Sequence, residues 1–143
     1  MKKLTDCMAA LCGAILSFVS GIPPILWVLT AMMSLDLVSG LAAGALGKSD
    51  NTPEGGLSSR AALRGLMKKG LILLVVLLAA LLDRAVALSA GVQFDAVTGA
   101  TCLWFIASEG LSVLENAAQI GVPIPKVLRQ ALEALKEQGA GEK

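Results

Sequence analysis

The sequence has no histidine and no tyrosine, and only 16% of its residues are charged. Without histidine it lacks the commonest general base and metal ligand at neutral pH, and no nucleophile–base set stands out. Cys7, Cys12 and Cys102 are unpaired in spacing and lie in apolar stretches, which indicates buried reduced thiols. The net charge of +1 gives no basic footprint for nucleic acid. We therefore expect no enzyme activity, no catalytic residue, no metal or cofactor site, and no nucleic-acid partner.

Long apolar runs are what the sequence does have. Between Leu4 and Leu35 the only charged residue is Asp6, and the apolar character continues past Asp36 to Gly47. A helix needs about 20 apolar residues to cross a bilayer, so this stretch is too long for one crossing and suits two. The prolines in Gly-Ile-Pro-Pro at 21–24 predict a turn between crossings at about 4–20 and 24–46. A single long, kinked helix is the alternative.

Two further crossings are predicted at about 65–88 and 96–120. The uncharged run at 70–82 is short for a crossing, and we expect Lys69 and Arg84 to extend it by snorkelling toward the membrane edges. Asp83, beside Arg84, is expected at a solvated boundary. The predicted fold class is therefore an all-α integral membrane protein. Its domain, residues 1–122, is a bundle of four (alternatively three) transmembrane helices.

The tail, residues 123–143, has the pattern of an amphipathic helix. We interpret it as an interfacial or partner-binding element, and the alternative is a helix that lies on the membrane surface without a partner. Its apolar positions are Ile124, Val127, Leu128, Ala131, Leu132 and Leu135. Its charged positions are Lys126, Arg129, Glu133, Lys136 and Glu137.

The distribution of lysine and arginine predicts the topology. With four crossings, eleven of these residues fall on one side of the membrane and one on the other; with three crossings the division is nine to three. In both cases the positive-inside rule places the central loop and the C-terminal tail in the cytoplasm. The stronger bias favours four crossings.

Polar residues inside the predicted crossings are the candidate functional residues. A charge at the bilayer centre costs at least about 2.5–3.5 kcal/mol, so a carboxylate there must be protonated, paired or in contact with water. The last crossing carries a polar stripe, which we interpret as a wet pore face. The alternative is hydrogen bonding between helices without a channel. The stripe consists of Glu109, Ser112, Glu115, Asn116 and Gln119.

A face of small residues marks the second crossing. Asp36, Gly40 and Gly44 follow one another at four-residue steps, and this spacing permits close approach of another helix backbone. We interpret these residues as a contact between subunits of a homo-oligomer. Packing within one subunit is the alternative.

The stretch from Glu109 to Leu128, which reads EGLSVLENAAQIGVPIPKVL, resembles the C-terminal signature of the toxin-secretion/phage-lysis holins, a phage holin family. Other marks similar to that family occur in the same order, and together the resemblance covers about residues 21–128. The chain departs from the family at Val38, where an aromatic residue is frequent. The other marks are DLVSG at 36–40, Ser58 and Ser59, Gly65, Lys68 and Lys69, and Leu82 and Asp83.

The resemblance implies a small protein of the bacterial inner membrane that accumulates, oligomerises and opens large, poorly selective lesions. Those lesions would release a cell-wall hydrolase (endolysin) or a toxin and so lead to host lysis. In a silent form the polar faces would pair, and in the open form they would face a common lumen. Two other functions are weighed beside this one: a non-lytic export channel or small transporter, and a membrane adaptor whose tail recruits a cytoplasmic partner.

Overall fold

The computed structural model describes residues 22–50, 52 and 54–140, together with Met8 and Gly13. Within these residues the protein is all-helical, with four helices and no strand, which confirms the predicted fold class. The predicted crossing at 4–20 falls almost entirely outside the described residues. The helices are α2 (Pro24–Ala45), α3 (Ser59–Ala90), α4 (Ala96–Ile120) and α5 (Lys126–Ala140).

The helix ends follow from proline, serine and glycine at the boundaries. α2 begins at Pro24, where the missing proline N–H would have had no intrahelical partner. The Ser58 hydroxyl accepts a hydrogen bond from the Ala61 N–H and so caps the start of α3. α3 and α4 each end at a glycine with positive φ, Gly91 at 66° and Gly121 at 96°, a conformation that suits glycine.

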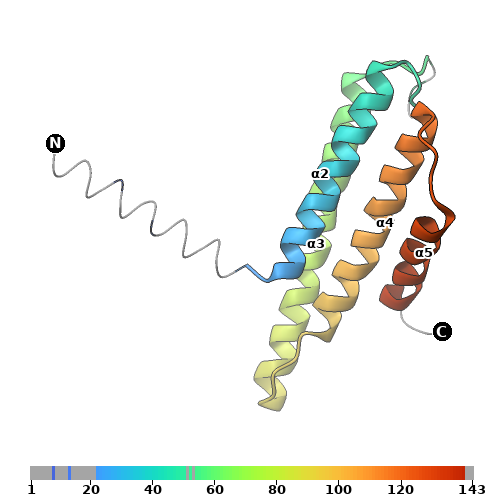
Figure 1. Ribbon diagram of the computed structural model, residues 1–143. Helices are drawn as coiled ribbons and strands as arrows, with labels where there is room; N and C mark the ends of the chain where they lie inside the picture. The colour runs from blue at the N-terminus through green and yellow to red at the C-terminus, as the bar shows by residue number, and fades with distance from the viewer. Residues whose placement is uncertain (1–7, 9–12, 14–21, 51, 53, 141–143) are drawn as a thin grey trace.

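Three of these helices, α2, α3 and α4, are long and apolar enough to cross a membrane. α4 lies between the other elements and contacts α2, α3 and α5 (Figure 1). A small apolar core joins the first three helices, and each of them supplies two of its buried members. These are Leu29 and Met33, Ile72 and Val76, and Cys102 and Ile106.

The tail helix folds back along α4 instead of standing apart (Figure 1). Leu132 of α5 is buried at 7% exposure, and its side chain lies at Gly110 of α4 and near Met32 of α2. The apolar side of α5 therefore packs against α4 of the same chain. Val127 and Leu128, at the start of α5, stay exposed.

Candidate functional site

A lysine between two carboxylates ties the three long helices together. The Lys69 ammonium of α3 donates a hydrogen bond to Asp36 Oδ2 of α2 at 2.7 Å and another to Glu109 Oε2 of α4. Lys69 is 7% exposed and Glu109 is 1% exposed. The expectation that Lys69 snorkels to the membrane edge is therefore wrong. The reason is electrostatic: inside the bundle the ammonium is paired with two carboxylates on neighbouring helices, which would otherwise be left without a cation.

Asn116 extends this network along α4. Its amide donates to Asp36 Oδ1 at 3.1 Å and to Ser39 Oγ at 2.9 Å, both on α2. A Cβ atom at Gly40 would lie 3.5 Å from the same amide nitrogen, an ordinary van der Waals distance, so Gly40 lies directly against Asn116. We call Asp36, Lys69, Glu109 and Asn116 the interhelical network.

The network has a formal charge of minus one, from two carboxylates and one ammonium. In an apolar setting an unpaired member would be costly, at about 3–5 kcal/mol when one partner of a buried pair is removed. The arrangement therefore fixes the relative position of α2, α3 and α4. It fits side chains that face a bundle interior and would not suit a lipid-facing surface.

A cleft of about 500 Å³ opens beside the network, between α2, α3, α4 and the loop that joins α2 to α3. Within the cleft Gln119 Nε2 donates to Asp50 Oδ2 at 3.0 Å, and at the C-terminal end of α4, outside the cleft lining, Lys48 Nζ donates to the Ile120 carbonyl oxygen at 3.3 Å. The cleft therefore mixes cations and carboxylates and is suited to water. Its charged and polar lining includes Asp50, Arg64, Lys68, Ser112, Glu115 and Gln119.

The structure divides the polar stripe that the sequence predicted on α4. Glu109 is buried on Lys69, and Asn116 is buried on α2. Ser112, Glu115 and Gln119 line the cleft, which Asn116 also borders, and Glu115 is exposed. Whether any of the five faces a pore stays a prediction.

The small-residue face of α2 points into the same subunit. Gly40 lies against Asn116, and a Cβ atom at Gly44 would lie 3.1 Å from Leu57 Cδ2 of the following loop. Asp36 is occupied by Lys69 and Asn116. These are the packing contacts that the sequence left open as the alternative, and the contact between subunits stays a prediction.

Asp83 has a role that the sequence analysis missed. It is 3% exposed, and its two carboxylate oxygens accept hydrogen bonds from the Val97 N–H at 3.1 Å and the Thr98 N–H at 2.7 Å. These N–H groups belong to the first turn of α4, where helices lack internal acceptors. The expected solvated boundary is therefore wrong, because this carboxylate caps the start of the next helix.

The sequence that builds this arrangement matches a known protein family. The model of the bacteriophage holin family matches residues 13–137. The chain belongs to the bacteriophage holin family. The match includes every member of the interhelical network and nearly all of α5.

Several known proteins are similar to this chain over much of its length. An uncharacterised protein of Clostridium perfringens (strain 13 / Type A) is 39% identical over 110 residues, 77% of this chain and 73% of the relative. An uncharacterised protein of Halalkalibacterium halodurans is 33% identical over 138 residues, 95% of this chain and 96% of the relative. A protein of Bacillus phage phi105 described as a probable holin is 42% identical over 80 residues, 56% of each chain. No solved structure matches.

Family membership and the three long apolar helices together identify a multi-pass membrane protein. The apolar runs at 24–46, 65–88 and 96–120 predicted this class from the sequence, and they overlap α2, the central part of α3 (Ser59–Ala90) and α4. The Lys69 and Asp83 contacts were not anticipated.

Proposed function

We propose that this chain is a holin: it oligomerises in the bacterial inner membrane and opens lesions wide enough to release a folded cell-wall hydrolase, or a toxin. The observation that carries the proposal is the holin-family match over residues 13–137, on a chain with three helices long and apolar enough to cross a membrane. The relative from phage phi105 described as a probable holin supports it. The function needs no catalytic group, because the lesion acts by assembly.

The orientation belongs to the same proposal. The loop between α2 and α3 and the C-terminal tail would lie on the cytoplasmic side, since lysine and arginine concentrate there. The lipid bilayer and further copies of the chain would be the direct partners. The hydrolase or toxin would be a cargo that passes through the lesion.

Within this role we assign two tasks to the polar stripe. Ser112, Glu115 and Gln119 would form a wet face, because they already line a polar cleft. Glu109 and Asn116 would keep the helices of each subunit together through Lys69 and Asp36. The lumen would then be built from intact bundles.

The contact between subunits through Asp36, Gly40 and Gly44 is a separate part of the proposal. Because these residues face α4 and the loop of their own chain, the contact requires α2 to exchange those partners for equivalent ones on a neighbour. Gly40→Leu should then remove cross-linked oligomer ladders from membranes. Ladders unchanged in this variant would restrict Gly40 to packing within the subunit.

The experiment that tests the function is induced expression in bacteria with and without a cytoplasmic cell-wall hydrolase that has no export signal. Optical density and release of a large cytosolic enzyme are followed together, with the hydrolase alone and the chain alone as controls. We expect growth to stop and abrupt lysis to occur only when both are present, because only a wide lesion lets a folded hydrolase reach the wall.

Two other outcomes would replace the proposal. Leakage of ions or small solutes without release of the enzyme would indicate a selective export channel. Continued growth with no leakage would indicate an adaptor that acts by binding a cytoplasmic partner through the tail.

A further inference from the structure

The outer face of α5 cannot lie against lipid where the structure puts it. α5 runs antiparallel to α4, with Leu132 opposite Gly110 and Gly139 opposite Trp104 and Ala100. Gly110 precedes the end of α4 at Ile120 by about 15 Å at 1.5 Å per residue, half the thickness of a hydrocarbon core of about 30 Å. α5 therefore lies beside the middle of a membrane-spanning helix.

The contact between α5 and α4 is closely fitted. A Cβ atom at Gly139 would lie 2.6 Å from the Trp104 backbone nitrogen, and one at Gly110 would lie 2.9 Å from a Leu132 methyl group. A glycine on each helix therefore permits the close approach of the other helix at these two points. The Lys136 ammonium lies 5.2 Å from the centre of the Trp104 ring, in cation–π range.

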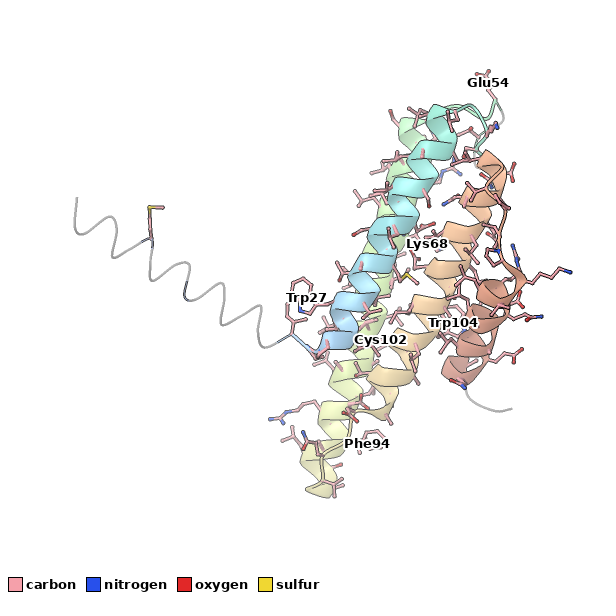
Figure 2. All side chains as sticks on the ribbon, in the orientation of Figure 1. Trp27, Glu54, Lys68, Phe94, Cys102 and Trp104 are labelled. Atoms are coloured by element: carbon pink, nitrogen blue, oxygen red, sulfur yellow. The ribbon has the colours of Figure 1, made fainter. Side chains whose placement is uncertain are left out.

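The side of α5 that faces away from α4 is charged. Figure 2 shows side chains tipped with nitrogen and oxygen projecting from α5 away from the bundle. Arg129, Glu133 and Glu137 are all exposed. Charged side chains at mid-membrane depth require water or a charged partner.

The opposite side of the molecule has the reverse character. α3 exposes a nearly unbroken apolar surface that includes Leu71, Leu74 and Leu78. In Figure 1, α4 separates most of α3 from α5. Each bundle therefore has a lipid-compatible side on α3 and a water-requiring side on α5.

We propose that α5 docked on α4 lines the aqueous lumen of the assembled lesion, with the charged face of α5 toward the water. In an intact bilayer without a lumen the same helix leaves α4 and lies on the membrane surface. Docking of α5 thereby stabilises the open assembly. This inference rests on the proposed holin function and adds the element that forms the wall of the lumen.

A reversible cross-link tests the direction of this coupling. Gly110→Cys and Leu132→Cys are combined in a chain whose Cys7, Cys12 and Cys102 are replaced by alanine, because removing the Leu132 methyl groups leaves room for a disulfide at that contact. The protein is placed in phosphatidylethanolamine/phosphatidylglycerol vesicles loaded with fluorescent dextran. We expect the oxidised protein to release dextran at least as fast as the same protein after reduction.

The opposite result would overturn the inference. If the reduced protein releases dextran and the oxidised protein does not, α5 must leave α4 for the lesion to open, and it is a restraint. If neither form releases dextran although both are inserted, the lesion itself is absent and the holin proposal falls with the lumen. The two failures are therefore distinguishable.

A second measurement does not depend on the disulfide. A bimane fluorophore is attached at Leu128→Cys, an exposed apolar position of α5, and at Glu133→Cys on the charged face as the matched control. In vesicles that have released dextran, lumen placement predicts quenching of both labels by aqueous iodide. Quenching of the Leu128 label by nitroxide-bearing lipids would instead place α5 on the membrane surface in the open state and contradict the inference.

Discussion

α3 and α4 are both long and apolar enough to cross a bilayer, yet their surroundings differ. α3 buries a narrow edge and leaves most of its leucines exposed. α4 contacts α2, α3 and α5, and it buries Glu109 and Asn116 among its apolar residues. Similar length and overall apolar character therefore serve two purposes: α3 provides a surface for lipid, and α4 provides the centre around which the other helices are arranged.

The two helices meet through a small number of polar contacts at different levels. Lys69 of α3 binds Glu109 near the middle of α4, and Asp83 of α3 caps the first turn of α4. Between these contacts the buried edge of α3 is apolar, with Ile72, Val76 and Ala79. Substitutions along the buried edge of α3 should therefore change stability much more than substitutions on its outer surface.

The largest effect is expected for Lys69→Met. It leaves the carboxylates of Asp36 and Glu109 without their cation, and we expect the free energy of unfolding in detergent micelles to fall by about 3–5 kcal/mol. Thermal unfolding monitored by circular dichroism measures the change. Lys68→Met is the matched control, since Lys68 is exposed next to it, and should change stability by no more than about 0.5 kcal/mol. Equal losses in both variants would contradict the interhelical network.

A triple variant tests whether the loss in Lys69→Met comes from unpaired charge. Neutralising all three groups, with Asp36→Asn, Lys69→Met and Glu109→Gln together, removes the unpaired buried charges that the single substitution creates. We expect the triple variant to be more stable than Lys69→Met alone. A triple variant as unstable as the single one would show that the lysine acts through packing of its aliphatic chain and not through its charge.

The helix boundaries can largely be predicted from the sequence, because proline and glycine mark them. The crossing predicted at 96–120 coincides with α4 because turn-forming glycine flanks the apolar run on both sides, at 91 and 121. The start of α2 follows from Pro23 and Pro24. These boundaries are set by local chemistry, which the sequence contains directly.

The local sequence does not show that the side chains of Lys69 and Asp83 point into the bundle. Both lie on the buried edge with Ile72, Val76 and Ala79, at spacings of 3, 4, 3 and 4 residues. This spacing marks one helix face and could have identified both residues as buried. The outward positions of α3 are equally apolar, however, so hydrophobicity does not distinguish the buried face from the exposed one. Only contact with α4 distinguishes the two faces. For the same reason the sequence showed the amphipathic tail without showing that α4 is its partner.

An intermediate effect should separate the two faces of α3 directly. Ile72 is 4% exposed and Leu74 is 61% exposed, two residues apart on the same helix. Ile72→Ala removes buried contacts, and we expect a loss of about 2 kcal/mol, the low end for this change, because surrounding lipid or detergent is as apolar as the core. Leu74→Ala should change the unfolding midpoint little. Reversed sensitivities would mean that α3 presents its other face to the bundle.

The smallest of the three effects is expected for Asn116→Leu on α4. It removes the amide hydrogen bonds to Asp36 and Ser39, and the free energy of unfolding should fall by about 1–2 kcal/mol. Ser112→Ala, one turn away in the polar cleft, is the control and should leave stability unchanged.

Induced lysis with a cytoplasmic hydrolase supplies a second measurement on Asn116→Leu. If Asn116 holds the subunit together, the timing of lysis should shift along with stability. A shift in timing at unchanged stability would instead place Asn116 on the wet face, whereas no change in either would reduce it to a replaceable packing residue.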